Sequence, residues 1–255
     1  MRIQYASDLH PIQRREFVYP KCEADILILA GDCLSKSEFD MLYIQKCLTM
    51  FHILIYVPGN HDFYTSGLTH YDIDSRLSDM FSDVQNAIYL DNSYCEINGV
   101  RFLGSCLWAS TQDVETKYIN DFKHIYETPG HLITEYDIDR LHSESCEFFD
   151  SNITKNSICI THFPPIRDGA SHPDYEIHCH IFKDNLKNKK CLRKKKTFNY
   201  YTNDINCTSV KPNYWIYGHT HFSNSQIING CAYLSNQLGY KGECTGYSNC
   251  ALFEI

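Results

Sequence analysis

Aspartate, asparagine and histidine side chains follow five short apolar runs of this sequence, at the point where each run ends. The runs are rich in isoleucine, valine and tyrosine, which is typical of buried β-strands. The polar residues that follow them are, in order, Asp8 and His10, Asp32, Asn60 to Asp62, His162, and His219 and His221. Because ligands bind outside the carboxyl ends of strands in open α/β sheets, we expect these side chains to share one edge. Such a set of oxygen and nitrogen donors predicts a two-metal site, the kind that hydrolyses phosphate esters.

The first two blocks suit metal binding by their spacing. Asp8 and His10 lie two residues apart at a strand end, where both can reach one ion. Gly31 allows a sharp turn before Asp32, and the two oxygens of that carboxylate can bridge two cations. Each residue alone has an ordinary alternative, because aspartates also form turns and cap helices.

The later blocks are more specific. Asn60 offers a neutral carbonyl ligand beside His61, which can work as an acid or a base. His219 and His221 follow Gly218, and both could enter a core only at a heavy desolvation cost, whereas both can bind metals. A lone histidine is more often a satisfied polar residue than a ligand, but five blocks that agree in order favour the metal interpretation.

The bulk properties fit one globular enzyme domain. The chain has 255 residues and is 43% hydrophobic, so we expect a single domain over residues 1–255. The sequence contains no run of about 20 apolar residues, so we expect no transmembrane segment, and no secretory signal is visible. The 13 cysteines are scattered without a Cys-x-x-Cys pair. We therefore expect a cytoplasmic, reducing location, no disulfide framework, and cysteines that act mostly as small buried residues.

One segment departs from the acidic character of the chain. The net charge is −8, yet Lys183 to Lys196 holds eight basic residues and one acid, so the remainder carries −15. We interpret the basic stretch at about 178–196 as an insertion. Lys187–Lys196 could bind nucleic acid, an anionic membrane surface or a polyanionic substrate, but a solvated loop is the favoured interpretation. The sequence does not predict an oligomeric state.

The expected elements make an α/β fold. Helices are predicted at Ser35 to Phe51 and at about 67–82. The stretch from about 113 to 151 is predicted to be mostly helical, with a break at Thr128-Pro129-Gly130. A hairpin is expected at Asn98-Gly99 and another at Asn229-Gly230. Strands are predicted at residues 3–7, 26–30, 53–57, 157–161, 214–217 and near 249–254. Two mixed β-sheets packed face to face and flanked by helices would satisfy this order.

The five blocks together resemble the calcineurin-like metallophosphoesterase superfamily, whose pattern is Asp-x-His, Gly-Asp, Gly-Asn-His-Asp/Glu, a lone His and Gly-His-x-His. Further stretches resemble its small, single-domain bacterial-type members: Val100 to Trp108, Asn120 to Phe122, Thr161 to Pro165 and Ser235 to Tyr240. Two features depart from those relatives. His162 is followed by Phe-Pro-Pro where they usually carry a second histidine, and the basic insertion is additional.

The resemblance implies two divalent metal ions, with Mn²⁺ the preferred metal and Fe, Zn²⁺ or Mg²⁺ as alternatives. It implies that Asp32 bridges the two ions. The other implied ligands are Asp8, His10 and His221 for one metal, and Asn60, His162 and His219 for the other. Asn60 and His61 are implied to contact the substrate.

The predicted reaction is an in-line attack on phosphorus by a hydroxide held between the metals. His61 is expected on the leaving-group side, where it stabilises the transition state and protonates the departing alkoxide. Asp62 is expected to orient His61 through a hydrogen bond, with a turn or capping role as the alternative.

We therefore predict a dinuclear metal-dependent phosphoesterase whose substrate is a phosphate ester, with phosphodiesters preferred. One alternative is a phosphomonoesterase acting on nucleotides or phosphoproteins, and a nuclease is a narrower variant. A non-catalytic interaction scaffold is the alternative from another class, but scaffolds of this superfamily typically lose ligands or the catalytic histidine.

Overall fold

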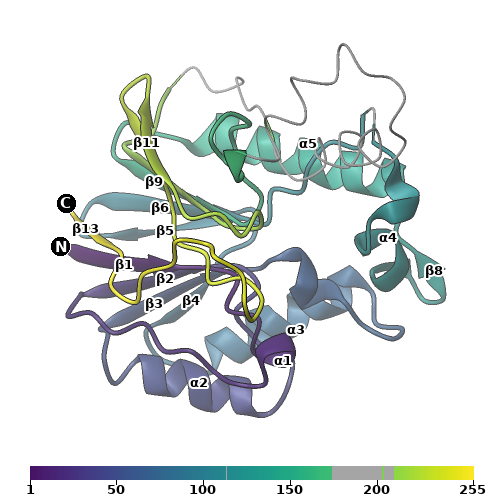
Figure 1. Ribbon diagram of the computed structural model, residues 1–255, viewed down its shortest axis with the longest axis horizontal. Coiled ribbons are helices and arrows are strands. Elements are labelled where there is room, and N and C mark those ends of the chain that lie inside the picture. The colour runs from purple at the N-terminus through teal and green to yellow at the C-terminus, as the bar shows by residue number, and fades with distance from the viewer. Residues whose placement is uncertain (113, 174–202, 204–209) are drawn as a thin grey trace.

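Two β-sheets packed face to face form the centre of the computed structural model (Figure 1). The structure describes residues 1–255 except 113, 174–202 and 204–209, so the predicted basic insertion at about 178–196 lies outside the described residues. Helices cover the outer faces of the sheets. The predicted α/β class with two packed mixed sheets is confirmed.

The first sheet has the strand order β13-β1-β2-β3-β4, and the second has the order β11-β12-β10-β9-β6-β5. The strands of the first sheet are β1 (Arg2–Ala6), β2 (Ile26–Ala30), β3 (Ile53–Val57), β4 (Ala87–Tyr89) and β13 (Leu252–Glu254). Those of the second are β5 (Ser93–Ile97), β6 (Val100–Ser105), β9 (Ser157–Thr161), β10 (Tyr214–Tyr217), β11 (Ser225–Ile228) and β12 (Cys231–Ser235).

Parallel pairing inside each sheet aligns the ends of the strands that matter for the site. Strands β1 to β4 are parallel, as are β6, β9, β10 and β12, whereas β13, β5 and β11 pair antiparallel at the margins. Past the ends of β1 and β12, Ser7 and Gln237 form an isolated parallel bridge. The two sheets therefore meet at the edge where their parallel strands end.

Side chains that alternate along the strands divide the core into two clusters. Isoleucines of β2 at positions 26 and 28 face the second sheet, where they pack with Phe102, Ile158 and Ile160. Leu27 and Leu29, which alternate with these isoleucines, belong to the other cluster, which the helices cover. Because both faces of these strands are buried, they appear in the sequence as continuous apolar runs.

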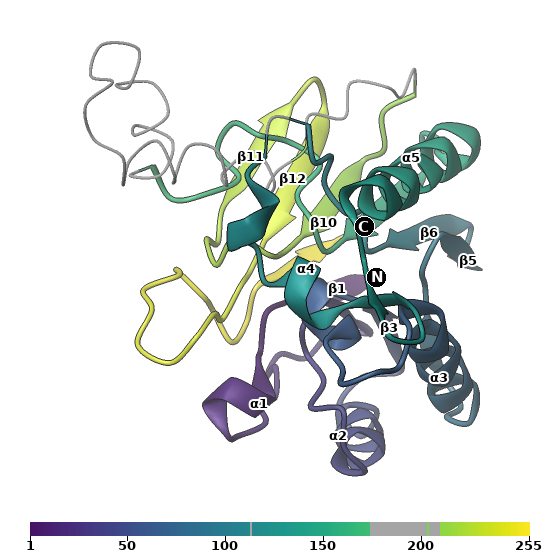
Figure 2. The same cartoon turned by 90° about the vertical axis from the view of Figure 1, so that its right-hand side faces the viewer.

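Helices on opposite sides complete the layers (Figure 2). Phe81 of α3 packs on Tyr56 of β3 at 5.2 Å between ring centroids, and Phe149 of α5 packs on Trp215 of β10 at 5.1 Å. The α-helices are α1 (Pro11–Arg14), α2 (Phe39–Cys47), α3 (His70–Ser82), α4 (Asp121–His124) and α5 (Glu135–Asn152). Two 3₁₀ turns, η1 (Asn60–Phe63) and η2 (Thr116–Tyr118), and a small hairpin of β7 (Tyr126–Thr128) and β8 (His131–Leu132) complete the elements described.

The predicted helix at Ser35 to Phe51 is shorter than expected. The Asp40 carboxylate accepts hydrogen bonds from the backbone N–H of Ser35 at 2.8 Å and of Ser37 at 3.1 Å. This local bonding competes with helical bonding, and Lys36 between the serines has a φ of 58°. The helix therefore begins at Phe39, and Leu42 on it is exposed.

The prediction of a mostly helical stretch from about 113 to 151 was wrong for its first half. Only α5 is a long helix there, and it begins with a capping box in which Thr134 and Asp137 bond to each other's backbone N–H. Before it come η2, the four-residue α4 and the β7–β8 hairpin, with Gly130 in its turn at a φ of 80°. The hairpins at Asn98-Gly99 and Asn229-Gly230 are confirmed, with positive φ at all four residues.

The cysteines follow the prediction except for one pair. Of the eight free cysteines in the described part of the chain, five are buried, as expected. Cys22 and Cys250, however, are paired as a disulfide across 228 residues of sequence, which the prediction of no disulfide framework did not foresee. Among the helices that the structure describes, none is both long and apolar enough to cross a membrane.

Replacing Gly104 with alanine tests the packing between the sheets. A Cβ on Gly104 would lie 2.4 Å from the Cβ of Leu90 and 2.8 Å from the Cγ2 of Val57, closer than real contacts allow. We expect Gly104→Ala to lower the free energy of unfolding by about 1–3 kcal/mol through overpacking, measured by urea denaturation. An unchanged unfolding midpoint would show that the sheets move apart more easily than this packing indicates.

Candidate metal centre

The predicted polar blocks all lie at the edge where the parallel strands end. They follow β1, β2, β3, β9 and β10, so three come from the first sheet and two from the second. Side chains from the two sheets make direct contact there. The Nε2 atoms of His10 and His221 are 2.9 Å apart, and the Nε2 of His162 lies 3.4 Å from an oxygen of Asp32. The structure thus brings together residues that are up to 213 positions apart in the sequence, the separation of Asp8 and His221.

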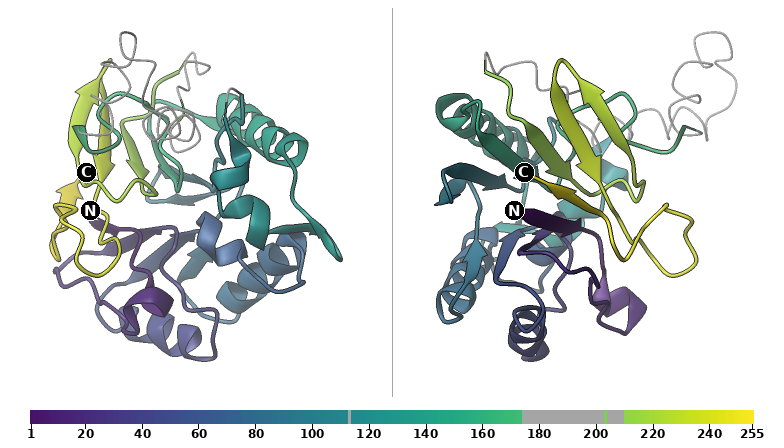
Figure 3. Two further views of the ribbon diagram at one scale, coloured as in Figure 1. Left: turned by 45° about the vertical axis from the view of Figure 1, so that its right-hand side comes forward. Right: turned by 90° about the vertical axis from the view of Figure 1, so that its left-hand side faces the viewer.

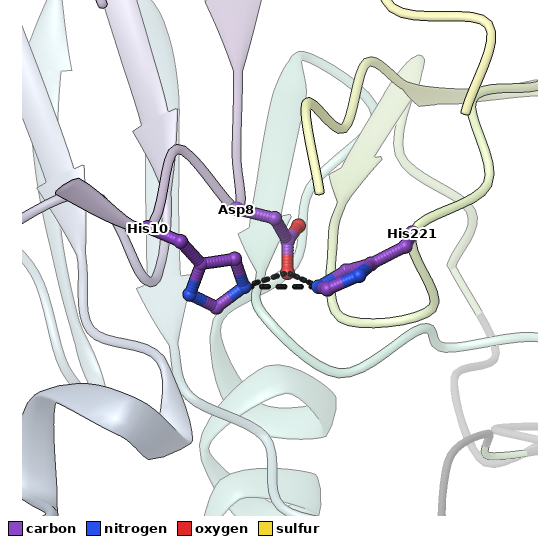
Figure 4. Close-up of side chains that lie close together, drawn as sticks. All are labelled: Asp8, His10 and His221. Atoms are coloured by element: carbon purple, nitrogen blue, oxygen red, sulfur yellow. Dashed lines mark hydrogen bonds and ion pairs between the residues drawn. The ribbon is translucent and has the colours of Figure 1, made fainter. Parts of the chain in front are cut away.

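One group consists of Asp8, His10 and His221, whose donor atoms point toward a common centre (Figure 4). The Oδ1 of Asp8 lies 3.9 Å from the Nε2 of His10 and 3.5 Å from the Nε2 of His221. Asp8 and His10 are buried, and the side chain of His221 is only 17% exposed. This group is able to hold a divalent metal ion.

A second group joins Asp32 and His162 to Asp8. The Nε2 of His162 faces the Oδ1 of Asn60 at 3.1 Å and the Nδ1 of His219 at 3.3 Å. Asn60, His162 and His219 therefore converge with Asp8 beside Asp32. Asp32 also lies 3.9 Å from the Nε2 of His10 in the first group. Its position between the two groups suits a carboxylate shared by two ions.

Backbone conformation aims these side chains. Residues Asp8, His10, Asp32, His219 and His221 all have φ between 45° and 75°, in the left-handed region that non-glycine residues rarely adopt. Each such residue stores on the order of 1–2 kcal/mol of strain, which the surrounding structure must offset. Residues held in this region at one edge indicate a functional site.

Close contacts at Gly31 and Gly59 explain why the Gly-Asp and Gly-Asn-His-Asp motifs begin with glycine. A Cβ on Gly31 would lie 2.2 Å from the Nδ1 of His162, and a Cβ on Gly59 would lie 2.2 Å from the Oδ1 of Asp32. Glycine is therefore required at both positions by close approach of a site residue, and at Gly31 by a φ of 88° as well.

Hydrogen bonds on the outer side of two imidazoles fix their tautomers. The carbonyl oxygen of Ala30 lies 3.0 Å from the Nδ1 of His162, and a carboxylate oxygen of Glu243 lies 2.6 Å from the Nδ1 of His221. Because these oxygens only accept, the Nδ1 atoms donate, and in the neutral rings each Nε2 presents a lone pair to the centre. Inward lone pairs beside two carboxylates are the donor set that a divalent cation needs.

The electrostatics of the cluster favour positive charge at its centre. Burial lowers the pKa of His10 to about 4, against the attraction of Asp32 and Asp8, and lowers the pKa of His219 well below its usual value. Burial would also lower the pKa of His162, but Asp32 and then Asp8 raise it to about 10. The His10 and His219 rings are thus neutral near pH 7, the form that binds metals, and the two carboxylates attract a cation.

His61 lies at the rim of this cluster. Its ring stacks on Tyr64 at 4.4 Å between centroids, and its Nε2 lies 3.3 Å from the hydroxyl of Tyr240. It also forms a metal-capable group with His10 and Asp32, although the resemblance implies that it is not a ligand.

Asp62 contacts the backbone turn instead of the His61 ring. Its Oδ2 accepts from the Tyr56 hydroxyl at 2.6 Å, from the N–H of Gly59 at 2.7 Å and from the N–H of Asp32 at 3.3 Å. Within the described residues, Asp62 makes no hydrogen bond to the imidazole of His61. This geometry supports the turn and capping role, the alternative to the expected orienting role. Burial, followed by repulsion from Asp32, raises the pKa of Asp62 to about 7.

Three residues outside the predicted set of ligands and catalytic residues support the site: Asp121, Tyr64 and Glu243. Asp121 of α4 is buried and accepts from the Nδ2 of Asn60 at 2.8 Å and from the hydroxyl of Tyr64 at 2.5 Å. The Asn60 amide is thereby held with its oxygen toward His162. Asp121 lies in the motif Asn120 to Phe122, which is the one sequence signal that pointed to it. Glu243 is the third residue, and no spacing rule connects it with His221.

Fold and site together define the class of protein: a sandwich of two mixed β-sheets flanked by helices, with a cluster of metal-capable side chains where the parallel strands of both sheets end. More specifically, the chain belongs to the calcineurin-like phosphoesterase family, whose sequence model matches residues 1–223. The resemblance drawn from the five blocks is thereby confirmed.

Two comparisons extend this result. Uncharacterized protein L509 of Acanthamoeba polyphaga mimivirus is 29% identical over 228 residues, which cover 84% of this chain and 77% of that protein. The structure is similar to that of phosphopantetheinyl hydrolase from Mycobacterium tuberculosis, with a TM-score of 0.63 and 15% identity over 95% of this chain and 93% of that one. At this level of identity, the likeness shows a shared fold.

Removing the Asp121 carboxylate should destabilise the protein. In Asp121→Ala, the buried amide of Asn60 and the hydroxyl of Tyr64 both lose an acceptor, and we expect a decrease of about 1–3 kcal/mol in the free energy of unfolding. Chemical denaturation of the metal-free protein measures this decrease in the free energy of unfolding. Tyr64→Phe is the matched control, because it removes the Tyr64 hydroxyl and its longer 3.3 Å bond from Asn60 but leaves the 2.8 Å bond from Asn60 to Asp121 intact, so its effect should be smaller. Equal effects of the two substitutions would contradict the role given to Asp121.

Proposed function

We propose that this protein is a phosphodiesterase that uses two divalent metal ions, with Mn²⁺ preferred. The observation that carries the proposal is the convergence of seven donor residues from both sheets on one partly strained edge. In this proposal Asp32 is the shared ligand. The remaining ligands are Asp8, His10 and His221 for one ion, and Asn60, His162 and His219 for the other. Family membership and the metal-capable groups support metal-dependent hydrolysis of phosphoesters.

The bound cations would supply an activated water nucleophile and neutralise charge on the phosphate oxygens. The protein contributes the orientation. Asp121 holds the Asn60 oxygen toward the centre, and the carbonyl of Ala30 holds the His162 ring. Burial keeps the pKa of His10 low, so its neutral ring is available.

His61 is placed to act on the leaving group. Its ring stands edge-on to His10 at 4.9 Å between centroids and is partly exposed, so it borders both the metal groups and solvent. We assign it the stabilisation of the transition state and the donation of a proton to the departing oxygen, with Asn60 and His61 both contacting the substrate. Asp62 supports this role indirectly, by closing the turn that carries His61.

A scaffold without activity fits the site less well. Every residue implied as a ligand, as well as His61, is present and lies at the same edge of the sheets. A protein that only bound partners would have no need for five left-handed residues around buried carboxylates, since such strain lowers stability. The preference for diesters over monoesters is part of the proposal and is decided by assay.

Metal uptake and a paired substrate assay test the proposed function. We expect the metal-free protein to take up two Mn²⁺ per chain and then to hydrolyse bis(p-nitrophenyl) phosphate faster than p-nitrophenyl phosphate. Asp32→Asn is the control, because it weakens a ligand shared by both ions at nearly constant volume. Stoichiometric uptake with faster monoester hydrolysis would replace the diesterase assignment by a monoesterase. No uptake of manganese, iron or zinc would refute the metal-dependent function.

Substitution of His61 separates catalysis from metal binding. We expect His61→Ala to bind two metals as the wild type does and to lose about 10²–10⁴-fold in kcat, the range typical of general acids. His131→Ala, an exposed histidine on β8, is the control and should leave kcat unchanged. Wild-type kcat in His61→Ala would exclude the leaving-group role, and a loss of one metal would instead make His61 a ligand.

A further inference from the structure

The loop that follows β12 forms one wall of the metal centre, although it lies beyond residue 223, where the family match ends. It leaves the sheet beside the Asp8 turn: the N–H of Leu238 bonds to the carbonyl of Ser7 at 3.1 Å, and the N–H of Gly239 bonds to the carbonyl of Asp8 at 3.0 Å. In Figure 3 the yellow loop lies next to the turn that leads into α1. Its residues are therefore held at the site by backbone contacts.

Glu243 of this loop makes two contacts through one oxygen. Its Oε2 lies 2.6 Å from the Nδ1 of His221 and accepts from the N–H of Tyr240 at 2.8 Å. On the far side of the same ring, the Nε2 of His221 faces Asp8 at 3.5 Å. The imidazole is thus bound between a carboxylate outside the centre and a carboxylate inside it.

The shape of the loop is adapted to this contact. Gly239 has a φ of 70°, and a Cβ at that position would lie 2.6 Å from the Oε2 of Glu243 and 3.3 Å from the Cγ of His221. The ring of Tyr240 packs 4.6 Å from the rings of both His10 and His221, measured between centroids. Glycine makes room for the pair, and Tyr240 covers the two histidines of the first group.

We propose that Glu243 is a positioning residue that prepares His221 to bind metal. By accepting a hydrogen bond from the Nδ1–H group, it fixes the tautomer in which the Nε2 lone pair faces Asp8 and His10, and it increases the basicity of that nitrogen. The inference rests on the proposed function, because it assigns His221 as a metal ligand. It goes further in naming an acidic side chain that sets the affinity of one metal position and lies outside the family pattern.

Two features set the expected size of the effect. Partners of this kind typically change metal affinity by about 10- to 100-fold. The side chain of Glu243 is 42% exposed, so water screens its charge and can replace part of the hydrogen bond. We therefore expect a loss near the lower limit, about 10-fold, for one of the two metal positions.

Calorimetric titration of the metal-free protein with Mn²⁺ tests the proposal. In Glu243→Ala, we expect one Mn²⁺ to bind about 10-fold more weakly and the other to bind as in the wild type. Glu243→Gln, which keeps an accepting oxygen, should restore part of the affinity. Activity lost by Glu243→Ala at low Mn²⁺ should return at excess Mn²⁺. Lys241→Ala, an exposed neighbour in the same loop, is the control and should bind both ions normally.

The outcomes separate this inference from the proposed function. If the wild type binds two Mn²⁺ and hydrolyses phosphoesters while Glu243→Ala binds both ions with unchanged affinity, the positioning role is overturned and the proposed function stands. A wild type that binds no metal overturns both. A merely structural contact would lower the melting temperature of metal-free Glu243→Ala and weaken both ions alike, which also counts against the proposal.

Discussion

The structure depends on one constraint: carboxylates that repel each other and imidazole lone pairs are held together in a buried space. Asp8 and Asp32 are buried beside the imidazoles of His10, His162 and His221, each of which offers a ring nitrogen to one of the metal-capable groups. Such a cluster is unfavourable unless a positive charge compensates it, and the raised pKa of His162 shows the strength of that demand. The surrounding architecture serves to hold these groups against that penalty, with two sheets packed tightly enough that a single methyl group at Gly104 would not fit.

Strain and packing act together at this edge. Left-handed residues such as Asp32 and His219 would relax if their loops were free to move. Instead, the turns lock one another: the Asp8 carboxylate accepts from the N–H of His219, and the Asp32 carboxylate accepts from the N–H of His61. Residues that we assign as metal ligands therefore also serve as structural links between loops. For variants at these aspartates, both the stability of the protein and its metal content should therefore be measured.

Sequence patterns predicted the strands and the meeting of the polar blocks at one edge, because buried parallel strands appear as continuous apolar runs and each polar block directly follows one. They failed where short-range hydrogen bonds decide the outcome. Asp40 captures the N–H groups of Ser35 and Ser37 and delays the start of α2. For Asp62 the sequence left two roles open, and the bond from the N–H of Gly59 favours the turn role. Contacts between distant segments, such as Glu243 with His221, leave no periodic signal in a single sequence. The positive φ values of the site residues also cannot be predicted from the sequence, apart from the glycines that accompany some of them.

The pairing of the two chain ends has a practical consequence. Strands β1 and β13 are neighbours, and the amino group of Met1 bonds to the carbonyl of Ile255 at 2.6 Å (Figure 3). Because the metal centre lies where β1 finishes, both ends emerge at the opposite rim of the sheet. Extra polypeptide fused to either end, or a surface to which the protein is tethered there, would leave the approach to the cluster unobstructed. A short peptide could also join the two ends, so that the chain could be reopened in an outlying turn without altering the order of strands around the site.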